Sequence, residues 1–471
     1  MSLSAALSTA TAGLSTLQTQ SAVLSGNVSN AQDADYSRRY ATLTTQSVNG
    51  LPLASRVASI LRVTDSALSQ SYYSSVSNLG LTDAQLANAQ KLAEALGASE
   101  SSSDQTALGT ALSQFEEAWK DMEATPESAS LKSQVITRAQ ELLTEISRLA
   151  EQENSLRGTA QDDIQAGLTS INDAAARIAA LNSQIVAQRA GGQSTADLED
   201  LRDAELAKIA EQTDIKVLID DRGAMSVYSA NGVQMVAGTQ AQSFSYNADS
   251  NTISTASGND VTAGLAGGAL QGQLDFLDTS AAALASSDPN RGGLAKFMNQ
   301  LDALAQNVMD VVNAAYDDPD TADAEVFFEI DPTAPSDARI STSLIVAVSA
   351  DDLLATRAGA VQQAISTTQI DSAHSNPSTA PNGLRLNSTT LSGLVSGILS
   401  YQARAASEAE SNQAAAETAK STLEVKLQDT KGVDIDTELA QLQLLQNNYA
   451  ALANVLNSII AMYDELMSIG R

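Results

Sequence analysis

Few residues in this 471-residue chain carry the chemistry that catalysis or metal binding requires. The absence of cysteine excludes disulfides, thiol catalysis and cysteine-based zinc sites. The single histidine, His374, lies in the turn-rich stretch SAHSNPSTAP, which favours an exposed loop position. One imidazole cannot supply the histidine set of a zinc site.

Other candidate chemistry is equally sparse. An acidic run could be interpreted as a calcium loop, but it lacks the spacing and the glycine of an EF-hand, so a solvated loop is expected: Asp317, Asp318, Asp320, Asp323 and Glu325. No GxSxG, HExxH or phosphate-binding loop occurs, and the glycines of AGLAGGALQGQ have no βαβ context. We therefore expect no catalytic, cofactor-binding or metal-binding residues, and a protein that is not an enzyme.

The charge balance excludes further classes. With 56 acidic and 26 basic residues the formal net charge is −30, which argues against a nucleic-acid partner. No run approaches the roughly 18 apolar residues of a membrane-spanning helix, so no membrane insertion is expected. No Lys or Arg precedes Arg38, so the charged region of a cleaved signal peptide is missing. A protein that works outside the cell would need another export route.

Both ends of the chain carry a heptad pattern. Prolines occur only between Pro52 and Pro381, so long terminal helices are permitted. Near the N-terminus, positions step alternately by four and three residues and all but one are apolar: Leu3, Leu7, Ala10, Leu14, Leu17, Ser21, Leu24 and Val28. Near the C-terminus all the corresponding positions are apolar: Leu442, Leu445, Tyr449, Leu452, Leu456, Ile459, Tyr463 and Leu466.

Such spacing is typical of coiled-coil seams, although a single amphipathic helix on a core would also show it. Two matching segments at opposite ends favour pairing. Because a two-helix pair alone buries little apolar surface, we expect neighbouring subunits to complete the burial, and we predict the apolar seam residues as a subunit interface.

Between the ends, helical and strand-like patterns alternate. Helices are expected at 82–96, 104–124, 128–190, 196–212, near 268–316 and at 391–430. Short alternating stretches between turn signals predict strands within 214–256 and 326–348.

The predicted fold is mainly α with inserted β. Paired terminal coiled-coil helices, residues 1–65 with an extended motif loop and 432–471, join a helical middle domain and a small antiparallel β-containing outer part. The middle domain comprises 66–213, 266–316 and 386–431, and the outer part 214–265 and 317–385. The domains are nested, so both termini should meet at one end.

Two terminal motifs resemble those of bacterial flagellar axial proteins. The first combines Asn27-Val28-Ser29-Asn30-Ala31 with Tyr36-Ser37-Arg38, and it is similar to the pattern NxSNAxTPGYSR that follows the first helix of rod, hook and junction proteins. Here Asp33-Ala34-Asp35 replaces Thr-Pro-Gly, which affects the expected turn. The second is the stretch GVDIDTEL at 432–439, which contains Asp434 and Asp436.

The central region resembles one family more specifically. The stretches IAALNSQI, DLEDLRDAELAKIAE, SVYSANGVQMVAG and GGALQGQLDFLD, at 178–185, 197–211, 226–238 and 267–278, are similar to the family of flagellar hook-associated protein 1. This is the first junction protein between hook and filament. The resemblance covers most of the chain, and residues 317–385 are its least recognisable part.

The resemblance implies an extracellular structural subunit, required for filament attachment, whose terminal helices line a tube. It implies secretion through the flagellar type III apparatus without a cleaved signal peptide, and a cytoplasmic export chaperone on the C-terminal helix. It also implies self-assembly in a ring, with hook protein on one side and the second junction protein on the other.

Physical roles for the first motif follow from side-chain chemistry. Asn27 and Asn30 can satisfy free carbonyls at the helix end. Tyr36 offers an intersubunit contact, and Arg38 and Arg39 call for carboxylate partners in so acidic a chain. The alternative is that these residues only stabilise a turn within the subunit.

Three other functions remain open. Another axial protein, such as a hook or filament subunit, shares the terminal motifs, although Tyr-Ser-Arg disfavours flagellin and LRDAELAKIAE disfavours hook protein. A secreted coiled-coil type III translocator is disfavoured by the missing apolar segment. An enzyme is disfavoured by the missing site.

Overall fold

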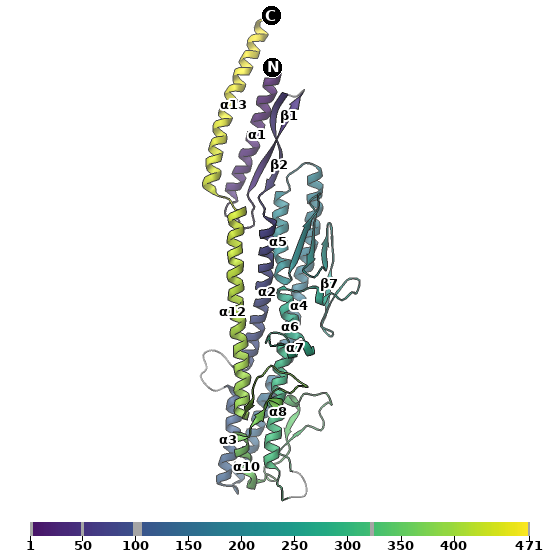
Figure 1. The fold of residues 1–471 in the computed structure, drawn as a ribbon, viewed down its shortest axis with the longest axis vertical. Helices are drawn as coiled ribbons and strands as arrows, with labels where there is room; N and C mark the ends of the chain where they lie inside the picture. Colours follow the sequence, from purple (N-terminus) through teal and green to yellow (C-terminus); the bar gives the residue numbers. More distant parts are fainter. Residues whose placement is uncertain (1–2, 49–50, 98–105, 321–324, 470–471) are drawn as a thin grey trace.

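The protein is a long, narrow molecule with both termini at one end (Figure 1). The computed structural model describes residues 3–48, 51–97, 106–320 and 325–469. Its main helices are α1 (Leu3–Ser29), α2 (Ser66–Ala95), α3 (Ala107–Ala124), α4 (Ala129–Ala190), α5 (Ala196–Gln212), α6 (Gly268–Leu277), α7 (Ala281–Ala285), α8 (Gly293–Tyr316), α9 (Ile340–Ser343), α10 (Ala358–Thr367), α11 (Ser372–Ser375), α12 (Leu391–Lys431) and α13 (Ile435–Ile469).

The strands are short apart from the first two. They are β1 (Arg39–Val48), β2 (Leu51–Arg62), β3 (Ile215–Ile219), β4 (Met225–Ser229), β5 (Gln234–Ala237), β6 (Gln240–Ala241), β7 (Phe244–Asn247), β8 (Thr252–Thr255), β9 (Phe328–Ile330), β10 (Leu344–Val346), β11 (Ile370–Asp371) and β12 (Ser388–Thr389). Every strand pairing among the described residues is antiparallel. The predicted class, mainly α with inserted β, is confirmed.

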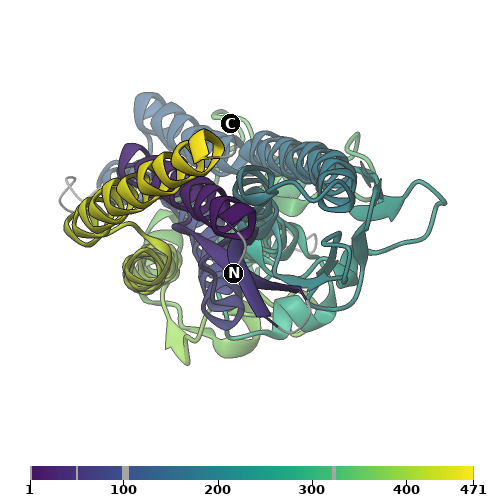
Figure 2. The same cartoon turned by 90° about the horizontal axis from the view of Figure 1, so that it is seen from above.

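The terminal end consists of α1, α13 and a β-hairpin. The two helices run side by side in both views (Figures 1 and 2). Gly13 provides the close approach, because a Cβ atom there would lie 2.8 Å from Cδ2 of Leu452. The hydroxyl of Thr16 donates to the carbonyl of Ser55 at 2.8 Å, which fixes the hairpin along α1.

This hairpin differs from the extended loop that the sequence predicts. Strands β1 and β2 pair from Arg39 with Arg62 outward, and the register shifts between Thr42 and Leu43 and again after Gln46. Such bulges break the period-two alternation by which strands are recognised in a sequence.

The middle of the molecule is a bundle in which α2 lies beside α12 and α4 spans much of its length (Figure 1). Helix α2 begins at Ser66, not at Thr82 as expected, because Asp65 caps it by accepting from the amides of Ala67 and Leu68, each at 3.0 Å. Gly80 allows α2 to approach α5, since a Cβ atom there would overlap the carbonyl oxygen of Glu211.

The far end is held by buried aromatic rings. Trp119 of α3 packs edge-on against Phe327, with centroids 5.2 Å apart, and Phe327 in turn contacts Phe328 at 4.7 Å. Tyr316 of α8 joins the same cluster. The expected VFFEI strand therefore supplies side chains to the core. Residues 317–385, which the sequence predicts as β-containing, also include helices α9, α10 and α11.

The inserted β-structure packs on α4. Strand β4 alternates buried and half-buried positions, with Met225, Val227 and Ser229 inward. The expected helical stretch 268–316 is divided into α6, α7 and α8, and Gly292 begins α8 from a left-handed conformation with φ of 66°.

Candidate functional site

Asn27 lies at the centre of a polar cluster where the terminal end meets the middle bundle. Its Oδ1 accepts from the Tyr36 hydroxyl at 2.9 Å and from the Arg39 amide at 3.0 Å. Its Nδ2 donates to the Arg39 carbonyl at 2.9 Å and to Oε2 of Glu438 at 3.0 Å. The fully buried side-chain amide of Asn27 thus connects α1 to the motif loop and to α13. The helix-capping role predicted for both asparagines is carried out by Asn30, which donates to the Gly26 carbonyl at 2.9 Å.

Tyr36 is used inside the subunit. Its side chain is buried, and the Arg39 guanidinium lies 4.5 Å from its ring centroid in a cation–π contact. Burial raises the pKa of the Tyr36 hydroxyl, which donates to Asn27. Within the subunit Tyr36 thus makes intrachain contacts, and the intersubunit contact expected of it stays a prediction.

The turn before Tyr36 forms without proline or glycine. Oδ1 of Asp33 accepts from the Asp35 amide at 3.0 Å, and the Asp33 carbonyl accepts from the Tyr36 amide at 3.2 Å. The carboxylate of Asp33 thereby stabilises the turn that Thr-Pro-Gly forms in the resembled motif.

Arg38 connects both ends of the chain. Its Nε donates to Oε1 of Glu438 at 2.6 Å, and its amide donates to the Lys431 carbonyl at 2.7 Å, where α12 ends. The Glu438 side chain is fully buried and sits in the first turn of α13, where a negative charge is favoured.

The second motif caps α13. Asp434 Oδ1 accepts from the amides of Asp436 and Thr437, and the hydroxyl of Thr437 holds the pKa of Asp434 below its usual value. Asp436 is exposed in the first turn of the helix.

Two arginines lie opposite each other at the base of the hairpin. Arg39 and Arg62 are cross-strand partners. Two like charges in such positions destabilise a hairpin unless nearby carboxylates neutralise them. Arg62 contacts Glu199 at 3.0 Å, Asp200 at 3.0 Å and Asp203 at 2.6 Å, all on α5. Arg39 contacts Asp200 at 3.2 Å and also Asp197. The carboxylate partners predicted for Arg38 and Arg39 are confirmed.

These ion pairs are largely removed from water. The side chains of Arg62 and Asp200 are 8% and 10% exposed. Burial lowers the pKa of Arg62, but the carboxylates around it, Asp203 foremost, raise it overall. For Glu199, burial alone would raise the pKa of the carboxyl group. The hydrogen bond from the Thr195 hydroxyl and the charge of Arg62 outweigh burial and bring this pKa below its usual value. The site as a whole, here named the ionic joint, consists of Asn27, Tyr36, Arg38, Arg39, Arg62, Glu199, Asp200, Asp203 and Glu438.

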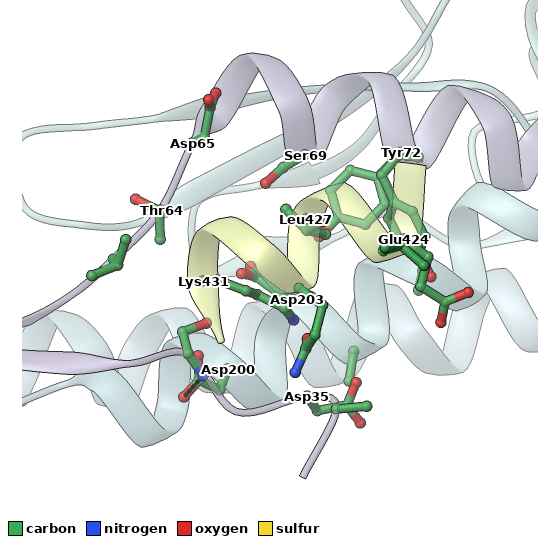
Figure 3. A pocket seen from close by; sticks show the side chains of 18 of the residues that line it. Asp35, Thr64, Asp65, Ser69, Tyr72, Asp200, Asp203, Glu424, Leu427 and Lys431 are labelled. Carbon is green, nitrogen blue, oxygen red and sulfur yellow. Dashed lines mark hydrogen bonds between the residues drawn. The ribbon is translucent and has the colours of Figure 1, made fainter. Parts of the chain in front are cut away.

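A cavity of about 350 Å³ adjoins the ionic joint (Figure 3). Figure 3 shows Asp35, Asp65, Asp203 and Glu424 around it, together with Lys431. Within the described ranges, no cluster of His, Asp or Glu could hold a metal ion. The cavity lies where the loop between α1 and β1, the connection from β2 to α2 and the end of α12 come together.

The predicted acidic loop and histidine lie away from the joint. Asp323 is outside the described residues, and Oδ1 of Asp317 accepts from the Glu325 amide at 3.0 Å. The ring of His374 is exposed in α11, with Nδ1 2.7 Å from a carboxylate oxygen of Asp371.

The seam positions divide by burial. Ala10, Leu24 and Ile459 are buried, and the others whose side chains are described are half-buried or, for two tyrosines, exposed: Leu7, Leu14, Leu17, Ser21, Val28, Leu442, Leu445, Leu452, Leu456, Tyr449 and Tyr463. The side chains of Leu3 and Leu466 lie outside the described residues. The seam therefore serves first to pair α1 with α13, and its role between subunits stays a prediction.

A second apolar row on α13 escaped the sequence analysis. Leu444, Val455 and Met462 are separated by 11 and 7 residues, which places them on one stripe, and they are 60%, 50% and 53% exposed. This stripe, here named the outer row, lies about a quarter turn around the helix from the seam. Its signal in the sequence is the helical spacing of these three apolar residues beside the seam.

Arg62, Asp200 and Glu438 were also missed. Up to residue 90 the basic residues are Arg38, Arg39, Arg56 and Arg62, a cluster that could have indicated a common carboxylate partner. The acidic run of α5 supplies that partner.

Comparison with known proteins identifies the central part of the chain. Residues 98–323 match the family described as the flagellar hook-associated protein FlgK helical domain. A search of curated proteins gives no match. Among solved structures, the flagellar hook junction protein FlgK from Burkholderia pseudomallei aligns at 19% identity with a TM-score of 0.45, covering 55% of this chain and 46% of that one.

None of the described helices is long and apolar enough to cross a membrane. The family match includes all four stretches on which the specific sequence resemblance rests, those on α4, on α5, around β4 and on α6, and it is independent of both terminal motifs. The match confirms that this chain resembles flagellar hook-associated protein 1.

Proposed function

We propose that this chain is an extracellular structural subunit of the bacterial flagellum at the hook–filament junction, required for filament attachment. The observation that carries the proposal is the outer row of α13. It leaves large apolar side chains in water at the end of the molecule where both termini lie. Exposed apolar patches of this kind mark interaction surfaces.

The hairpin extends the same surface. Tyr40 and Leu43 of β1 are 43% and 49% exposed, next to α1. A neighbouring copy in a ring would cover these side chains together with the outer row. Hook protein on one side and the second junction protein on the other would complete the contacts.

The ionic joint suits a subunit that has to keep its shape under load. A subunit that bears load between hook and filament needs a fixed angle between its assembling end and its body. Buried charges that are paired hold such an orientation, because a displacement would leave them without their partners. Arg39 and Arg62 hold the hairpin to α5, and Glu438 holds α13 to the motif loop.

Export before assembly also follows from the proposal. Before assembly the apolar residues of α13 are not covered by neighbours, so a cytoplasmic chaperone is required. The chaperone would bind the apolar stripes of α13 in a hydrophobic groove, as other proteins bind amphipathic helices. The chain would then pass unfolded through the flagellar type III apparatus without a cleaved signal peptide.

Co-sedimentation with purified hooks tests the proposal. Val455→Asp places a charge in the outer row, and burying it against a neighbour should lower hook binding by more than about tenfold. Leu201→Asp is the matched control, because Leu201 is 58% exposed on α5 in the middle bundle. Both variants should melt like the wild type. Undiminished binding of Val455→Asp, or equal loss in both variants, would contradict the proposed interface.

A further inference from the structure

A shallow groove of about 390 Å³ lies between the first half of α12 and the preceding loop, far from the ionic joint in sequence. Its lining includes Arg385, Ser400, Tyr401 and Arg404. Two cations thus converge on one groove in a chain whose net charge is −30.

Glycines build the groove. Gly383 has φ of 79°, and a Cβ atom there would lie 2.6 Å from Oη of Tyr401. At Gly397 a Cβ atom would lie 2.8 Å from Cδ1 of Leu386. The loop therefore packs directly on the helix and presents Arg385 beside the ring of Tyr401.

The two arginines of the groove form no ion pair within the described part of the chain. Among the described residues no carboxylate oxygen lies within 4.0 Å of Arg385 or Arg404, although most arginines of this protein are paired. Arg404 lies 5.6 Å from the ring centroid of Tyr401, and both guanidiniums remain exposed. Asp288 and Glu408 contribute charge near the tyrosine without reaching either arginine.

Tyr401 adds a phenol hydroxyl from a mostly buried side chain. Its side chain is 8% exposed, and its hydroxyl has no hydrogen bond to any described residue. Burial raises the pKa of Tyr401 to about 12, so the hydroxyl stays protonated and free to donate. Two guanidiniums and one phenol hydroxyl make a donor set suited to a carboxylate.

We propose that this groove accepts an acidic side chain from a second copy of this chain, as a lateral contact in the assembly. The inference rests on the proposed function, because only assembly brings copies together. Copies with this net charge repel one another, and a positive groove supplies local complementarity where their surfaces meet.

Site-specific photo-cross-linking tests the groove. A photoreactive phenylalanine analogue replaces exposed Ser400, which lies in the groove, and the protein is bound to purified hooks before irradiation. Chain-to-chain cross-links should form and map to peptides containing Asp or Glu. Arg385→Ala with Arg404→Ala should reduce their yield roughly five- to tenfold, the effect of two surface ion pairs.

The matched control is Lys120→Ala with Lys132→Ala, which removes two cations that likewise have no carboxylate within 4.0 Å among described residues. It should leave the yield unchanged. If the protein still binds hooks, three results would overturn the inference. The cross-links could be absent, they could join hook protein instead of a second copy, or they could persist without both arginines. Loss of hook binding by the wild type itself would overturn the proposed function, and this inference with it.

Discussion

Arg62 lies at the base of the hairpin, between three carboxylates of α5, and it precedes Glu199 by 137 residues in the chain. Replacing it with alanine would leave Glu199 and Asp200 buried without their principal cation. We expect Arg62→Ala to lower the free energy of unfolding by about 3–5 kcal/mol, the usual cost of breaking a buried ion pair. Chemical denaturation followed by circular dichroism measures this change.

The matched control lies on the same hairpin. Arg56 is exposed and has no carboxylate within 4.0 Å among the described residues, so Arg56→Ala should change stability by less than about 0.5 kcal/mol. Equal effects of the two substitutions would show that the joint adds no stability.

Glu199 makes the joint sensitive to acid. Its folded-state pKa lies below the usual value, so its stabilising contribution is present above about pH 4.3 and is lost as the pH falls further. Below about pH 4.3 the melting temperature of the wild type should therefore decrease as the pH is lowered. The melting temperature of Glu199→Gln should decrease less over the same interval. Parallel curves for the two proteins would contradict this assignment.

Some members of the joint were predictable, and others were not. Asn27, Tyr36 and Arg38 belong to a local motif, so a sequence pattern finds them. Glu438 meets Arg38 across 400 residues, and no local pattern records which distant carboxylate will be its partner. The arginine pair itself became visible only through the hairpin register.

At the scale of elements, glycine contacts decide how closely helices pack. A Cβ atom at Gly80 would overlap the backbone of Glu211, so Gly80→Ala should force α2 from α5 and cost about 1–3 kcal/mol. Gly158 of α4 faces open space, and Gly158→Ala should instead stabilise by about 0.4–1 kcal/mol. Thermal unfolding of both variants measures the contrast. A stabilising Gly80→Ala would show that α2 and α5 are not in close contact.

Elements with strong end signals were predicted closely. Helices α3, α4 and α5 end within a few residues of expectation, since Ser128 caps α4 and Gly191-Gly192 follows it. Helix α2 was found only in part, because its first half, SALSQSYYSSVSNLGL, is rich in residues of low helix propensity and is held by packing. The hairpin was missed because its bulges interrupt the alternation.

At the scale of the molecule, the terminal end depends on neighbours for burial. We expect brief digestion of the isolated monomer to trim α1, the hairpin and α13 from their free ends back towards the ionic joint, because those outer parts have few buried contacts of their own, and to leave the joint and the middle bundle folded. A protease of broad specificity is required, because residues 435–469 contain no Lys or Arg. Termini as resistant as the middle bundle, in protein shown to be monomeric, would contradict this expectation.

We propose that this chain joins hook to filament, with one end assembling and a body held at a fixed angle by the ionic joint. Electron microscopy of a strain lacking the chain, together with a flagellin blot of the culture supernatant, tests this role. We expect complete hooks without filaments, unpolymerised flagellin in the medium, and recovery of filaments on re-expression. Normal filaments on the deletion strain would contradict the junction role, and the absence of hooks would indicate a hook or rod subunit instead.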